Sequence, residues 1–98
     1  MNDKKGKPVI GQLKEQIHQA ILGREEEKAE ALKYLLSILE KESYRQEGLD
    51  EEKIIALLRA EMKRKKEALR LFEKGKRDDL VAKEEQEIEW LKPFLGVK

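Results

Sequence analysis

One stretch of the chain decides the fold: residues 50–80 read DEEKIIALLRAEMKRKKEALRLFEKGKRDDL. Asp50 is a residue type that caps the start of a helix, and the two glutamates behind it oppose the positive end of the helix dipole. Gly75 is a residue type that ends helices. This pattern predicts a helix over residues 51–74, the longest element of the chain.

Apolar residues inside this stretch recur with a rhythm of about seven residues, which places them on one helix face. They are Ile55, Leu58, Met62, Leu69 and Phe72. Lys65 interrupts this face, at a position where another apolar residue is due. The face is expected to turn toward the interior of the fold.

The residues that follow predict a further helix. Asp78 or Asp79 is expected to cap it, and Pro93 is expected to stop it. Its inner face is formed by Leu80, Glu84, Ile88 and Leu91. Leu95 is expected to close its end.

Two more helices are predicted upstream. The first begins near Pro8, a favourable residue type at a helix start, and ends at Gly23. The second runs from about Glu25 to about Arg45, and Gly48 closes it. Their main apolar faces are Ile10, Leu13, Ile17, Ala20 and Ile21 in the first, and Ala29, Leu32, Leu35, Leu36 and Leu39 in the second.

The second helix is apolar over an unusually wide arc, because Tyr34 and Ile38 lie outside its main face. Such a helix is best placed centrally, in contact with two or three neighbours. The short linkers favour antiparallel neighbours. We therefore predict an all-α fold, a small antiparallel bundle of about four helices in an up-and-down arrangement. Residues 9–98 form this domain, and residues 1–8 form a flexible arm.

The composition agrees with a small helical protein. Of its 98 residues, 44% are charged and five are aromatic, which suits one domain rather than separate substrate and cofactor lobes. Cysteine is absent, which excludes disulfides and thiolate chemistry. No signal peptide or membrane span is predicted, so we expect a cytoplasmic location and no membrane partner.

Residues suited to catalysis are few. His18 is the only histidine, and its place in an amphipathic helix favours an ordinary surface residue over a functional one. Ser37 and Ser43 lack the glycine-flanked turn of a nucleophilic serine, and no glycine-rich phosphate loop is present. The sequence therefore predicts no enzymatic activity, no cofactor and no small-molecule substrate.

Charge is segregated along the second half of the chain. Residues 59–77 hold nine basic and three acidic residues, whereas residues 78–89 hold six acidic residues and Lys83. The acidic part is a candidate for a metal site, but only Glu84 and Glu87 share a face near the core and no histidine joins them. We predict no metal site and expect the acidic helix to face the basic one.

Six basic residues follow one another at intervals of three or four, so they are expected along one side of the third helix. They are Arg59, Lys63, Lys66, Arg70, Lys74 and Arg77. Two interpretations are open: a solvated face that keeps the protein soluble, and a surface that tracks the phosphates of a nucleic acid or another anion. Aromatic residues, which would favour the second interpretation, do not interleave with them.

Two aromatic residues lie at the end of the fourth helix. Trp90 is off the face of Ile88 and Leu91, and Phe94 follows one turn later on its side. An apolar pair at a helix end is a candidate partner interface. The alternative is that both rings pack beneath the end of the chain.

A larger set of residues resembles a family signature. These residues are Lys65, Ala68, Leu69, Phe72, Gly75, Arg77, Asp79, Leu80, Glu84, Glu87, Leu91, Phe94 and Leu95. Their order is similar to the helical signature of the GatB/YqeY family, most specifically over residues 75–87. Within it, Gly75 is expected to supply a turn, Asp79 to cap the fourth helix, Leu80 to enter the core, and Arg77 to pair with a carboxylate such as Glu84.

The resemblance implies an α-helical domain akin to free-standing YqeY-like proteins and to the tail of the GatB component of the tRNA-dependent amidotransferase. In that enzyme the tail contacts tRNA, while glutamine hydrolysis and transamidation occur in other domains. It therefore implies a non-catalytic binding module with tRNA or amidotransferase subunits as partners, and a carbon-nitrogen ligase label only by association. The family's second, smaller lobe is expected to be absent, because the chain stops at Lys98. The alternative function is protein interaction or self-association through Trp90 and Phe94.

Overall fold

Four α-helices and one short 3-10 helix make up the computed structural model, which describes residues 8–45 and 48–96. The elements are α1 (Val9–Leu22), α2 (Glu26–Arg45), α3 (Glu51–Lys74), α4 (Asp78–Leu91) and η2 (Lys92–Leu95). The described residues contain no strand, so the prediction of a small all-α bundle of about four helices is confirmed. The predicted arm at residues 1–8 lies, apart from Pro8, outside the described residues.

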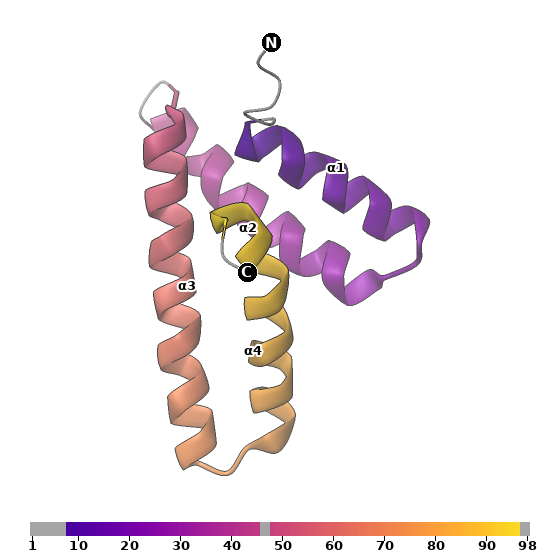
Figure 1. The fold of residues 1–98 in the computed structure, drawn as a ribbon, viewed down its shortest axis with the longest axis vertical. Coiled ribbons are helices and arrows are strands. Elements are labelled where there is room, and N and C mark those ends of the chain that lie inside the picture. Colours follow the sequence, from indigo (N-terminus) through magenta and orange to yellow (C-terminus); the bar gives the residue numbers. More distant parts are fainter. Residues whose placement is uncertain (1–7, 46–47, 97–98) are drawn as a thin grey trace.

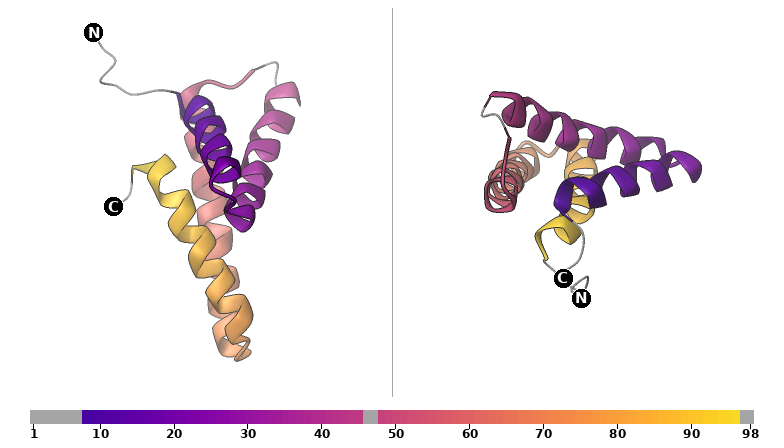
Figure 2. Two further views of the ribbon diagram at one scale, coloured as in Figure 1. Left: turned by 90° about the vertical axis from the view of Figure 1, so that its right-hand side faces the viewer. Right: turned by 90° about the horizontal axis from the view of Figure 1, so that it is seen from above.

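The helices form two antiparallel hairpins, α1 with α2 and α3 with α4 (Figure 1). The α1–α2 hairpin crosses the α3–α4 hairpin at the end away from the α3–α4 turn (Figures 1 and 2). The half of the α3–α4 hairpin that contains this turn, called here the distal half, therefore extends beyond the crossing. The four helices therefore do not lie side by side as the predicted up-and-down arrangement requires. The wide apolar arc of α2 explains the difference, because it lets α2 contact α1 on one side and the second hairpin on another.

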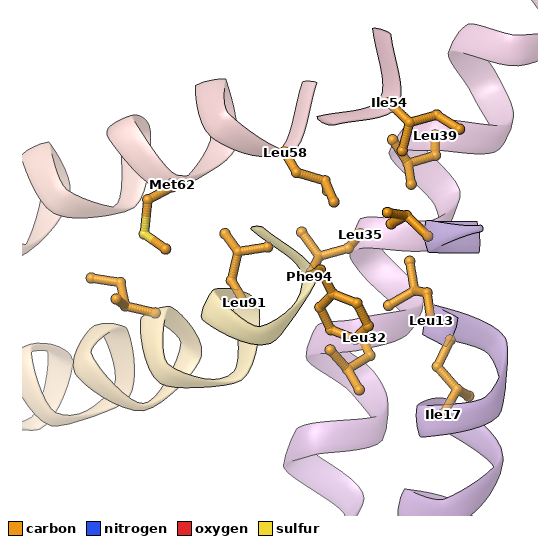
Figure 3. Packing of buried hydrophobic residues seen from close by; sticks show 12 residues of the cluster. Leu13, Ile17, Leu32, Leu35, Leu39, Ile54, Leu58, Met62, Leu91 and Phe94 are labelled. Atoms are coloured by element: carbon orange, nitrogen blue, oxygen red, sulfur yellow. The ribbon is translucent and has the colours of Figure 1, made fainter. Parts of the chain in front are cut away.

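The hydrophobic core lies where the two hairpins cross. Its fully buried side chains are Leu13, Leu32, Leu39, Leu58 and Leu91. Figure 3 shows residues of α1 and α2 meeting Leu58 of α3, Leu91 of α4 and Phe94 of η2. Leu69 and Phe72, predicted for the inner face of α3, are only half-buried, because the α1–α2 hairpin does not reach the distal half of α3.

The start of α3 is capped as predicted, whereas the start of α4 is not. Asp50 Oδ1 accepts a hydrogen bond of 2.9 Å from the backbone N–H of Lys53. In α4 the N-cap position belongs to Arg77, which makes no side-chain cap bond, and Asp78 and Asp79 lie in the first turn. The prediction that either aspartate caps α4 is therefore wrong. Their charges still oppose the positive end of the helix dipole.

The left-handed residue of the turn between α3 and α4 is Lys76, not Gly75. Gly75 has φ −84°, and Lys76 has φ 56°. The N–H of Lys76 donates to the carbonyl of Glu73, and that of Arg77 donates to the carbonyl of Phe72, which together form a Schellman motif. Gly75 is the C-cap of α3 and lies in the turn, as predicted, together with Lys76.

A long-range hydrogen bond joins the two hairpins. The backbone N–H of Val9, at the first turn of α1, donates to Glu51 Oε2 across 2.7 Å. An amide at a helix start has no partner within its own helix, so the carboxylate of α3 satisfies it. The start of α3 thereby holds the start of α1 in place.

Candidate nucleic-acid interface

Five of the six predicted basic residues lie on α3, and all five are exposed. These residues, named here the basic row, are Arg59, Lys63, Lys66, Arg70 and Lys74. Each of the first four follows by one position a residue of the inner face, so the row lies to one side of that face. At the helical rise of about 1.5 Å per residue, the row is about 22 Å long.

No close ion pair engages the basic row within the described part of the chain. Among the described residues, none of the five makes an ion pair with a carboxylate. Four of them line a shallow groove of about 380 Å³ together with Met62 and Glu67. Glu67 is the only carboxylate in this lining, so the groove is strongly basic.

Arg77, the sixth predicted residue, lies in the turn between α3 and α4. Its Nε is 3.5 Å from Asp79 Oδ1, and both side chains are exposed. The hydrogen bond from Arg77 lowers the pKa of Asp79 below its ordinary value. Arg77 therefore pairs with a nearby carboxylate, as predicted, but this carboxylate is Asp79 rather than Glu84, which lies on the inner side of α4.

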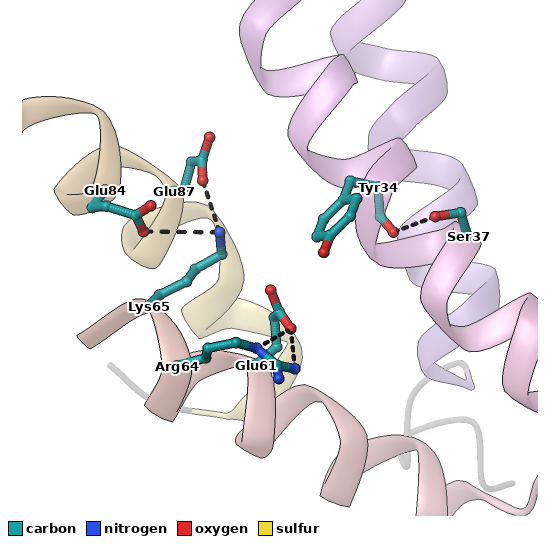
Figure 4. A network of polar contacts seen from close by, with 7 residues as sticks. All are labelled: Tyr34, Ser37, Glu61, Arg64, Lys65, Glu84 and Glu87. Carbon is teal, nitrogen blue, oxygen red and sulfur yellow. Dashed lines mark hydrogen bonds and ion pairs between the residues drawn. The ribbon is translucent and has the colours of Figure 1, made fainter. Parts of the chain in front are cut away.

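Lys65, not Arg77, is the partner of the glutamate pair. Its Nζ lies 2.7 Å from Glu87 Oε1 and 3.9 Å from Glu84 Oε1, and the three side chains are 12 to 19% exposed (Figure 4). This explains the interruption of the apolar rhythm. The ammonium of Lys65 occupies the inner face and binds α3 to α4 through opposite charge.

Glu84 is the less well satisfied of the two carboxylates. Its Oε1 is buried and has no hydrogen-bond partner. Burial raises the pKa of Glu84 above its ordinary value, although the nearby charge of Lys65 opposes this. The ionised form of Glu84 therefore destabilises the folded state, while Glu87 gains a short charged hydrogen bond.

Replacing the two glutamates is expected to have opposite effects at neutral pH. E87Q loses the charge that holds Lys65, which lowers the free energy of unfolding by about 1 to 2 kcal/mol. E84Q removes a carboxylate whose folded-state pKa is raised, so it increases that free energy. Wild type recovers this deficit as the pH falls through the raised pKa of Glu84, and the gain from E84Q is lost once the pH is below the ordinary pKa of a glutamate.

Urea unfolding of both variants at several pH values measures these effects. E85Q serves as the control, because Glu85 is exposed on the same helix and the charge change is the same. Equal losses of stability in E84Q and E87Q would contradict the assignment.

A second half-buried ion pair joins Glu61 to Arg64, and the sequence interpretation missed it. Glu61 is 5% exposed, and its Oε1 accepts hydrogen bonds of 2.7 and 3.2 Å from Arg64 (Figure 4). This contact raises the pKa of Arg64. The only signal in the sequence was the position of Glu61 beside Met62, one step from the inner face.

Trp90 and Phe94 have different environments. Phe94 is buried in the core, which favours the packing alternative for this ring. Trp90 is half-buried and lines a notch of about 1020 Å³ between the two hairpins. Ile21 and Tyr34, both more than half exposed, line the same notch. Its lining includes four basic and four acidic residues, so it has no dominant charge.

The remaining candidate residues occupy ordinary positions. His18 is exposed on the surface of α1, as expected. Within residues 8–45 and 48–96, no group of three histidine, aspartate or glutamate residues is arranged to hold a metal ion. No helix in these ranges combines the length and apolar character needed to span a membrane. Leu80 is only half-buried and does not pack against the core, so the prediction that it enters the core is wrong.

Comparison with protein families gives a match over most of the chain. The family model described as Yqey-like protein matches residues 10–97, which is most of the chain and includes all of the basic row. Among curated proteins, none matches the chain.

Proposed function

We propose, from the premise that this chain belongs to the family of Yqey-like proteins, that it is a non-catalytic binding module whose basic row contacts tRNA. The observation that carries the proposal is the row itself: five exposed cations on one side of a single helix, without ion pairs in the described chain. Each cation that meets a phosphate releases a counterion and adds affinity.

The proposal assigns no reaction to the chain. Glu87 holds α3 against α4 through its short contact with Lys65, and Glu84 lies beside the same ammonium. His18 lies on the surface of α1, and the row contains only cations that bind phosphate. In tRNA-dependent amidation, glutamine is the amido donor. An association of this chain with that reaction would then depend on amidotransferase subunits that bind the same tRNA.

Binding of tRNA at increasing salt concentration tests the proposal. Contacts with up to five phosphates predict a plot of log affinity against log salt with a slope of roughly −3 to −5. Fluorescence anisotropy of labelled tRNA measures the affinity. A slope near zero, or no binding at low salt, would overturn the proposal.

A second candidate function is protein interaction or self-association at the notch. It is supported by Trp90, Tyr34 and Ile21, which expose apolar surface inside one concave site. Multi-angle light scattering separates the two candidates. A molar mass that rises with protein concentration favours self-association, and Y34E or I21E is then expected to restore the monomer.

A further inference from the structure

The side of the α3–α4 hairpin that carries the basic row also carries acidic residues. On α4, Glu85 and Glu89 each follow an inner-face residue by one position, as the basic residues do on α3. Antiparallel helices turn in opposite senses when viewed down one axis. A residue that comes one position after an inner-face residue therefore lies on the same side of the hairpin in both helices. Asp78, two turns before Glu85, belongs to the same line.

The ion pairs of Lys65 set the register between the two helices. Because Lys65 contacts Glu84 and Glu87, residue 65 lies level with residues 84–87. Lys66 therefore lies level with Glu85, and Lys63, one turn earlier on α3, lies level with Glu89 one turn later on α4. A basic line and an acidic line thus run side by side along one face.

The acidic line, which comprises Asp78, Glu85 and Glu89, is exposed over its whole length. Glu89 Oε2 is paired with Lys92 Nζ at 2.8 Å, while Asp78 and Glu85 make no ion pair among the described residues. Packed helices lie about 8 to 10 Å apart, and the Debye length at physiological salt is about 8 Å. The acidic line is therefore close enough to repel an anion that extends sideways from the basic row.

We propose that the acidic line of α4 restricts the basic row to a single row of phosphates. This inference rests on the proposed function. A single strand can follow the row along α3 without approaching α4. A duplex lying flat on this face would place its second row of phosphates on the order of 10 Å to one side, above the acidic line. Asp78, Glu85 and Glu89 are thus specificity-determining residues that disfavour flat contact with a duplex.

The test compares wild type with E85Q/E89Q in binding to a short RNA duplex and to a single-stranded oligouridine of equal length. At about 50 mM salt, where screening is weak, the variant is expected to bind the duplex roughly threefold to tenfold more tightly. Affinity for the single strand is expected to change by less than about twofold. Both side chains are exposed, and circular dichroism checks that the fold is kept.

E30Q/E40Q is the matched control, because it makes the same change in net charge at two exposed positions on α2. An equal gain in duplex affinity from this control would show an effect of net charge alone and would overturn the inference. An equal gain for duplex and single strand in E85Q/E89Q would also overturn it. Either result leaves the proposed function intact if wild type still binds through the basic row. Absence of any salt-dependent binding by wild type would instead remove the proposed function.

Discussion

Reversing three charges of the basic row, in K63E/K66E/R70E, is expected to lower the affinity for tRNA by at least about 100-fold near physiological salt. The three side chains are consecutive members of the row and are exposed on the groove side of α3. The substitutions remove three phosphate contacts and add three repulsive charges. The salt dependence is expected to become flatter by about one unit for each lost contact.

The control for this variant is K14E/K41E/K53E. Its three lysines are exposed and lie outside the row, and the change in net charge is identical. This control is expected to weaken binding much less, because the lost charges do not form a continuous line. Unchanged affinity in K63E/K66E/R70E would exclude the basic row as the contact surface.

Shortening one core side chain, in L58A, is expected to lower the free energy of unfolding by about 2 to 5 kcal/mol. Leu58 is 1% exposed at the crossing of the two hairpins, so its loss leaves a cavity in contact with both. The total stability of a small domain is about 5 to 15 kcal/mol, which makes this loss a large share. Guanidinium unfolding followed by circular dichroism measures it.

Leu71 offers a matched control on the same helix. Its side chain is 67% exposed, so L71A is expected to change the free energy of unfolding by less than about 0.5 kcal/mol. Similar losses in the two variants would mean that the core does not lie at the crossing of the hairpins.

Local features of the fold were predictable from the sequence because they depend on neighbours along the chain. The helix over residues 51–74 has the predicted bounds, and Asp50 caps it, since a cap bond spans only three residues. The exposure of the basic row followed from its spacing in the same way. The crossing of the hairpins was not predictable, because a crossing angle depends on how the ridges of two helices interlock.

The sequence did not determine which side chains contact one another around the candidate site. Arg77 and Lys65 are both cations of the family signature, and only the register of α3 against α4 determines that Lys65 meets Glu84 and Glu87. Phe94 and Trp90 lie in one short segment, yet the burial of Phe94 depends on the position of the α1–α2 hairpin. Such outcomes depend on residues distant in the chain.

The α1–α2 hairpin covers only one half of α3, and this difference affects the motions of the helix. Arg59 and Lys63 stand on the half of the helix that is held by the crossing hairpin, whereas Arg70 and Lys74 stand on the half supported by α4 alone. Backbone amides of the distal half are therefore expected to exchange with deuterium sooner, because fewer buried contacts must break for that half to open. A bound polyanion would meet an ordered surface at one end and an adaptable one at the other.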